Sequence, residues 1–450
     1  MIRAGNDIQK VGRFHLICGF RSQRLGLAAV RLLVVFAAAT WFGCDPTPHI
    51  EGSKRASVGQ HVAIEVAQGP GLIKDDFVLT DAKGTKYEAS NGDVAYHFQD
   101  ENHVTFTIPR GITTGPATLR LGVQGRSSGY DVDFDILRIA VLLDPDGWLY
   151  SLDVDTGKVL DMDALGHGDL SAHMAPSGIR IAATASKEAA VHFIEVLGSG
   201  LRPYSPSLDG IANKTFDAIM LSAGALVATE KGIAWLSQGE FGSTVLNGFV
   251  GKGPVVRLGG SQTQGQALGL LGFTSDATDY RDLVEVVDLS GDEPQITSTL
   301  DLGGTVGGAS WLVVSPDGAY AWANNRLDDA ITVLSLGQSP AVTDHVNLPS
   351  QDKPQTDPFR MAVSPDGKQL VVLCGGSKSA VIYHVSDGAL SDPVIVDLED
   401  VPWDASFAAG RLYVLLGWKV VWMDPTSGSP KPVDAGWDVG VGMTRLMIQP

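Results

Sequence analysis

The chain has 450 residues, with 33 Lys and Arg against 51 Asp and Glu and a formal net charge of −18. So large an excess of acidic groups repels nucleic-acid phosphates and anionic membrane surfaces, which excludes nucleic acid as an expected partner. The 53 glycines and 23 prolines favour many short strands and turns over long helices, and the length predicts more than one domain.

The N-terminus differs from everything that follows it. Basic residues lead into an apolar run at residues 32–42, which is too short to span a bilayer but typical of a signal peptide. Gly, Cys44, Asp and Pro follow, and this stretch resembles a bacterial lipoprotein signal. The resemblance implies a signal peptide at residues 1–43, lipidation of Cys44 and a linker at residues 44–49. Cleavage nearby without lipidation, or an uncleaved anchor, are the alternatives.

Residues 50–137 contain short stretches in which apolar and polar side chains alternate, separated by Gly and Asp turns. Alternation with period 2 in several short segments predicts a β-sandwich. The segment 104–121 (VTFTIPRGITTGPATLRL) resembles the end of an IPT/TIG immunoglobulin-like domain. It contains no catalytic cluster, so we expect a spacer or a partner-binding module.

Residues 138–450 contain a repeat, whose two best copies carry the turn Ser-Pro-Asp-Gly at 315–318 and 364–367, 49 residues apart. A strand precedes each turn, and further strands follow it. Four strands in about 40 to 50 residues is the spacing of a β-propeller blade. Pro sets φ at the first corner, Asp bonds its own backbone, and Gly suits positive φ. With weaker copies, six blades begin near residues 171, 211, 250, 305, 353 and 401.

Two incomplete fragments predict a seventh blade. Residues 443–450 form an apolar strand cut off at its turn, and residues 139–153 form a blade that lacks this strand. Joined, they complete one sheet and remove an exposed edge. The expected fold is all-β: an immunoglobulin-like β-sandwich over residues 50–137, then a seven-bladed β-propeller over residues 138–450, closed by the N- and C-terminal strands of that domain.

The Ser-Pro-Asp-Gly turn, followed by a strand such as Ile331-Thr-Val333, resembles the seven-bladed YVTN and lactonase-like propellers of bacterial surface proteins. Residues 305–400 carry this resemblance. One repeat, at residues 146–160, is similar to those of quinoprotein-like propellers. Asp161 stands where that repeat usually has Trp, so no quinone is expected.

The sequence lacks two common motifs of hydrolases and metal sites: His-Glu-x-x-His and Cys-x-x-Cys do not occur. We therefore predict no catalytic residue, no metal ion and no cofactor. Polar residues near the blade starts are instead candidates for facing the central channel. They are His173, Asp217, Arg360, Asp404 and Arg445. The tryptophans are expected to pack between blades, with one or two at a channel mouth able to stack on a sugar.

These features favour a membrane-tethered binding or scaffold protein of the bacterial cell envelope, lipid-anchored and either periplasmic or surface-exposed. A propeller face would dock an envelope protein or a glycan. Two alternatives stay open. One is a lactonase-like propeller hydrolase that acts through the channel residues, and the other is an outer-membrane assembly lipoprotein, by analogy with the usually eight-bladed quinoprotein-like propellers.

Overall fold

The computed structural model describes residues 48–50, 54–66, 72–100, 102–124, 129–166, 170–175, 177–185, 190–204, 213–221, 224–238, 244–251, 254–261, 266–271, 281–291, 293–350, 354–437, 439 and 442–450. The expected signal peptide at residues 1–43 and the expected lipidation site Cys44 lie outside these residues. Within them, no helix is long and apolar enough to cross a membrane.

Two sheets form the first part of the described chain. Their strand orders are β1-β3-β7-β6 and β2-β9-β8-β4-β5. Their elements are β1 (Pro48–Ile50), β2 (Arg55–Ser57), β3 (His61–Val66), β4 (Leu72–Thr80), β5 (Lys86–Glu88), the 3-10 helix η1 (Ala89–Asn91), β6 (Tyr96–Phe98), β7 (His103–Thr107), β8 (Gly115–Val123) and β9 (Tyr130–Leu137). Buried and more exposed residues alternate along β7 and β9, as period-2 patterning requires. The buried sides of both sheets contribute to one apolar core.

Seven four-stranded antiparallel sheets make up the rest, and we call them blades 1 to 7. Blades 1 to 3 comprise β13 (Leu170–Met174), β14 (Arg180–Ala185), β15 (Ala190–Leu197) and β16 (Gly200–Tyr204); β17 (Thr215–Leu221), β18 (Gly224–Thr229), β19 (Gly232–Gln238) and β20 (Thr244–Val250); and β21 (Val255–Ser261), β22 (Gln266–Leu271), β23 (Leu283–Asp288) and β24 (Gln295–Asp301).

Blades 4 to 6 comprise β25 (Leu312–Val314), β26 (Tyr320–Asn325), β27 (Ala330–Ser335) and β28 (Ala341–Asn347); β29 (Pro358–Val363), β30 (Gln369–Cys374), β31 (Ser379–Ser386) and β32 (Ala389–Asp397); and β33 (Pro402–Ala408), β34 (Arg411–Leu416), β35 (Val420–Met423) and β36 (Val433–Asp434). Blade 7 comprises β37 (Arg445–Ile448), β10 (Ile139–Leu143), β11 (Trp148–Asp153) and β12 (Val159–Ala164).

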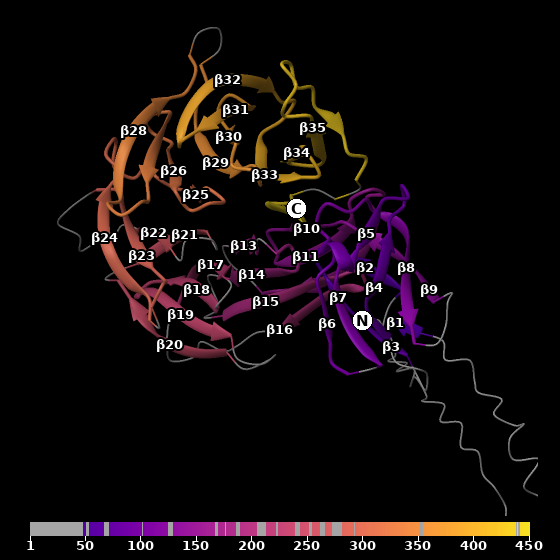
Figure 1. The fold of residues 1–450 in the computed structure, drawn as a ribbon. Coiled ribbons are helices and arrows are strands. Elements are labelled where there is room, and N and C mark those ends of the chain that lie inside the picture. Colours follow the sequence, from indigo (N-terminus) through magenta and orange to yellow (C-terminus); the bar gives the residue numbers. More distant parts are fainter. Residues whose placement is uncertain are drawn as a thin grey trace, which may run out of the picture. The chain divides into compact units, whose positions relative to one another are not determined.

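The first strand of each blade contacts the first strands of its two neighbours, from β13 through β37 and back to β13, so the blades form a closed ring. Figure 1 shows the sheets following one another around this ring in chain order. Separate apolar clusters fill the spaces between neighbouring blades. The β-propeller predicted from the repeats is confirmed.

Blade 7 joins the two ends of the propeller segment, as the two sequence fragments predicted. In the antiparallel pair β37 and β10, Ile448 lies opposite Ala140 and Arg445 opposite Leu143. Beyond the strand, the Gln449 side chain accepts a hydrogen bond from the Ile139 amide at 2.9 Å and donates one to the Gly178 carbonyl at 2.9 Å. The C-terminal residues therefore hold blade 7 together and tie it to blade 1.

The repeated Ser-Pro-Asp-Gly turn satisfies its own polar groups. Asp317 accepts hydrogen bonds from the Ser315 hydroxyl at 2.6 Å and from the Ala319 amide at 3.0 Å. Gly318 has a φ of 71°, a left-handed conformation that favours glycine. Asp366 and Ser364 repeat the hydroxyl contact at 2.6 Å in the next blade. These turns join first to second strands and mark one end of the blades.

Candidate functional site

At the opposite end of the blades, one residue near the start of each first strand occupies an equivalent position. We call these seven residues the central ring: Ser171, Asp217, Arg257, Trp311, Arg360, Asp404 and Arg445. Asp217, Arg257, Arg360 and Asp404 each follow directly on a shift in strand register. A β-bulge of this kind redirects a side chain, and such bulges are frequent beside functional sites.

Asp217 is completely buried and collects contacts from the two neighbouring blades. Its carboxylate accepts hydrogen bonds from the Ser171 hydroxyl at 2.6 Å and from the Leu258 amide at 3.0 Å. His173 Nε2 lies 2.8 Å from Asp217 Oδ1, although it is not aligned as in a good hydrogen bond. Burial alone would raise the pKa of Asp217, but His173, Arg257 and Ser171 outweigh it and hold the pKa well below its usual range.

Trp311 is the platform around which the basic groups gather. The guanidinium carbons of Arg360, Arg445 and Arg257 lie 3.9, 4.9 and 5.2 Å from the centre of its ring. The His173 ring stacks on it at 5.7 Å, with an angle of 19° between the planes. Trp311 is itself fixed, because its Nε1 donates a hydrogen bond to the Met361 carbonyl at 3.1 Å. The attraction between each guanidinium group and the electron-rich face of the Trp311 ring offsets part of the cost of gathering these positive charges.

The arginines retain unused donors. Arg445 is 2 % exposed, and its Nη2 donates to Ser171 Oγ at 3.3 Å. Its Nε and Nη1 have no hydrogen-bond partner among the described residues, and neither does Nε of Arg360. Arg257 donates to the carbonyls of Phe216 and Val256, both at 3.3 Å. A buried guanidinium without partners is costly unless an anion completes it.

The charges of the ring do not balance. Three guanidinium groups face two carboxylates, and Asp404 is engaged by the amides of Leu446 and Ala405 at 3.0 Å each. Burial lowers the pKa of both Arg360 and Arg445, repulsion from neighbouring arginines lowers it further, and Asp404 opposes the shift. The ring is therefore a basic site in a strongly acidic protein, and a bound anion would stabilise its charged arginines.

Comparison with known proteins agrees with this architecture. Residues 280–394 match the family model described as "Lactonase, 7-bladed beta-propeller". The propeller has seven blades, and residues 280–394 are similar to this family. No curated protein matches the chain.

Solved structures resemble the propeller over most of their own length. A putative 6-phosphogluconolactonase from Bacteroides uniformis is 13 % identical, with 69 % of this chain and 99 % of that chain covered and a TM-score of 0.55. A periplasmic gluconolactonase from Pseudomonas aeruginosa is 15 % identical, with 70 % and 99 % covered and a TM-score of 0.54. A hypothetical selenium-binding protein from Sulfolobus tokodaii is 14 % identical, with 69 % and 93 % covered and a TM-score of 0.53. At these identities the similarity shows the fold alone.

The structure places four of the five candidate residues, Asp217, Arg360, Asp404 and Arg445, in the central ring, and His173 two residues beyond Ser171. Sequence reasoning missed Ser171, Arg257 and Trp311. Arg257 holds the same place in its blade as Arg360, so the repeat register was a usable signal. Trp311 was assigned to packing between blades, and its contacts with three arginines could not be seen in the sequence.

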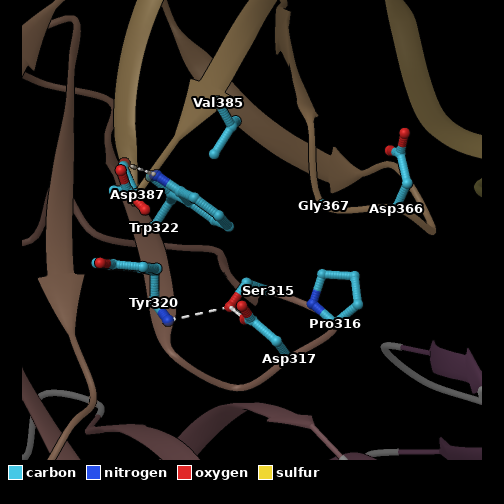
Figure 2. A pocket seen from close by; sticks show the side chains of 10 residues that line it. Ser315, Pro316, Asp317, Tyr320, Trp322, Asp366, Gly367, Val385 and Asp387 are labelled. Carbon is cyan, nitrogen blue, oxygen red and sulfur yellow. Dashed lines mark hydrogen bonds between the residues drawn. The ribbon is translucent and has the colours of Figure 1, made fainter.

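A cavity of about 190 Å³ lies at the other end of the propeller, where blades 4 and 5 meet (Figure 2). Its lining includes Asp317, Asp366 and Asp387 beside Tyr320 and Trp322. Asp317 and Asp366 are held by their own turns, and Trp322 Nε1 donates to the Gly388 carbonyl at 3.0 Å. These groups are satisfied within the fold, so the cavity is a weaker candidate than the central ring. Among the described residues, no cluster of His, Cys, Asp and Glu is suited to a metal ion.

Proposed function

We propose that the central ring is the active site of a hydrolase that opens the lactone of a sugar acid. The observation that carries this proposal is the close contact of His173 Nε2 with the buried carboxylate of Asp217, beside a tryptophan that three guanidinium groups surround. A buried carboxylate orients the imidazole as a general base, and the arginines supply positive charge where oxygen becomes negative. The lactonase family match and the gluconolactonase-like folds are consistent with this chemistry.

Each group has a defined role in the reaction. His173 Nε2 faces Asp217, so Nδ1 is the atom that takes a proton from water while the water oxygen attacks the lactone carbonyl. The carbonyl oxygen becomes an oxyanion, which Arg360 and Arg445 stabilise. Its collapse breaks the ring C–O bond, and the proton on His173 passes to the leaving oxygen. The product is a hydroxy acid that releases its acidic proton to solvent, and its carboxylate stays bound to the arginines.

The test is lactone hydrolysis by the full chain, with glucono-δ-lactone followed in a pH-stat against the spontaneous rate. Replacing His173 with Gln is expected to lower kcat by about 10²- to 10⁴-fold, the usual contribution of a general base. The exposed His384, on the third strand of blade 5, is the matched control, and His384→Gln should keep full activity. Hydrolysis at the spontaneous rate by the wild type, or equal activity in both variants, would rule out this function.

A second candidate is the docking role in the bacterial envelope, with Cys44 as a lipid anchor and the first two sheets as an IPT/TIG-like spacer. It is supported by the lipoprotein-like signal sequence and by the common core of those two sheets. Seven blades give no support to the assembly-lipoprotein alternative. Metabolic labelling with a palmitate analogue tests the anchor, because a Cys44→Ala variant should lose the label. Purification from envelope extracts tests the partner, a protein or a glycan.

A further inference from the structure

Three tryptophans are exposed at the end of the blades that carries the central ring. Trp403 directly precedes Asp404 at the start of β33, Trp418 lies in the turn after β34, and Trp148 opens β11. Their exposures are 43 %, 51 % and 40 %. Tryptophan is usually buried, and other tryptophans of the blades, such as Trp311 and Trp322, are indeed buried. We call Trp148, Trp403 and Trp418 the tryptophan patch.

Close contacts link the segments that carry the three tryptophans, across blades 6 and 7. Trp403 Nε1 lies 3.5 Å from the point where a Cβ atom on Gly417 would lie, and Trp418 follows Gly417 in the chain. Gly417 accepts a backbone hydrogen bond from Gly442 at 3.0 Å. A Cβ atom on Gly442 would lie 3.9 Å from Pro145, in the turn that leads to Trp148. The segments that carry the three indoles therefore adjoin one another next to the central ring.

Charged side chains border the patch, and acids are in excess there. Lys419 Nζ lies 4.5 Å above the Trp418 ring, in contact with Glu399 and 3.8 Å from Asp434. Asp400 lies 3.5 Å from the Cβ position of Gly417 and pairs with Lys378 at 3.6 Å. Such a border offers many hydrogen-bond acceptors but repels a ligand that carries negative charges along its length.

We propose that the tryptophan patch binds the neutral sugar units of an oligosaccharide whose single acid end lies in the central ring. This inference rests on the proposed function. In it, the substrate of the central ring is the acid end of an oligosaccharide and not a free monosaccharide. Pyranose rings present C–H faces that suit flat indoles, while their hydroxyl groups suit the surrounding carboxylates.

The charges favour this ligand over two other occupants. The unused donors of Arg445 and Arg360 require an anion at the ring itself. Along the patch, the acidic border and the net charge of −18 oppose a polyanion or an anionic membrane. Ion pairs that interrupt the apolar surface make it a poor match for the apolar centre of a protein interface.

The experiment compares ligands that differ only in length. The full chain is titrated calorimetrically with gluconate and with the aldonic acids of maltose, maltotetraose, cellobiose and cellotetraose. In at least one series, the tetrasaccharide acid is expected to bind about tenfold or more tightly than gluconate, which corresponds to about 1.4 kcal/mol, because its additional sugar units stack on more than one indole. Trp418→Ala and Trp403→Ala should lose this gain and still bind gluconate as the wild type does.

The control is Ile395→Ala, which removes a 40 % exposed apolar side chain from the outer strand β32 and should keep the gain. Neutral maltotetraose and cellotetraose should bind more weakly than their acids. The inference is overturned if affinity does not grow with length in either series, if the tryptophan variants keep the gain, or if vesicles of phosphatidylglycerol bind instead. Gluconate binding with lactone hydrolysis but no gain with length would leave the proposed function intact. Failure of gluconate to bind would instead count against the central ring.

Discussion

The two ends of the propeller blades differ in where their polar residues find hydrogen-bond partners. At the Ser-Pro-Asp-Gly turns, Asp317 and Asp366 are bonded by a hydroxyl two residues away and by a nearby amide. In the central ring, Asp217 takes its partners from the two neighbouring blades, and Arg445 keeps donors without partners in a buried position. Locally satisfied groups stabilise a turn, whereas buried charges that the fold leaves incomplete cost stability and are retained where a ligand completes them.

The largest expected effect comes from opening the closed circle of seven blades. The turns at one end of the blades and the central ring at the other both depend on this closure. Deletion of residues 443–450 removes β37 and leaves β10 as an unpaired edge inside the propeller. The buried residues Leu446, Met447 and Ile448 are lost with it. We expect loss of the cooperative thermal transition and aggregation, measured by circular dichroism and size-exclusion chromatography.

The matched control is Gln449→Ala, which keeps the strand and removes only the hydrogen bonds to Ile139 and Gly178. It should lower the free energy of unfolding by about 1 to 3 kcal/mol and leave a folded protein. A truncated chain that unfolds at the wild-type temperature would show that blade 7 does not close the ring.

Arg445→Met tests whether this residue of the central ring serves ligand binding and not stability. The variant should be at least as stable as the wild type but should bind gluconate more weakly. Replacing a buried, incompletely paired charge with an apolar side chain of similar length is often neutral or stabilising, so the unfolding temperature should stay the same or rise. Gluconate affinity should fall at least about tenfold, because a charged hydrogen bond to the carboxylate is lost. Arg326→Met, at an exposed ion pair with Asp357, should not change gluconate binding. A marked loss of stability in Arg445→Met would mean that the guanidinium serves the fold.

The same contrast explains what the sequence could predict. The turns and strand alternation are local patterns, so the repeat, the propeller and the shared blade 7 could be predicted from residues close in sequence. Five polar residues of the site were within reach because they lie near the blade starts. Their grouping around Trp311, and the bulges that redirect them, arise from packing between blades and have no local signature. One or two tryptophans were expected at a channel mouth, but the sequence could not show that Trp403 and Trp418 are among the exposed ones.

The smallest effect is expected at the turn, where Asp317→Ala should leave lactone hydrolysis unchanged. Hydrogen bonds from Ser315 and Ala319 lower the pKa of Asp317, so its ionised form stabilises the folded chain. That contribution is present above the unfolded pKa of about 3.9 and disappears as the pH falls through the lower folded value. The variant should lose about 1 kcal/mol at pH 7, and the difference from the wild type should shrink below about pH 4. A difference that does not depend on pH would mean that backbone geometry, and not the carboxylate, holds this turn.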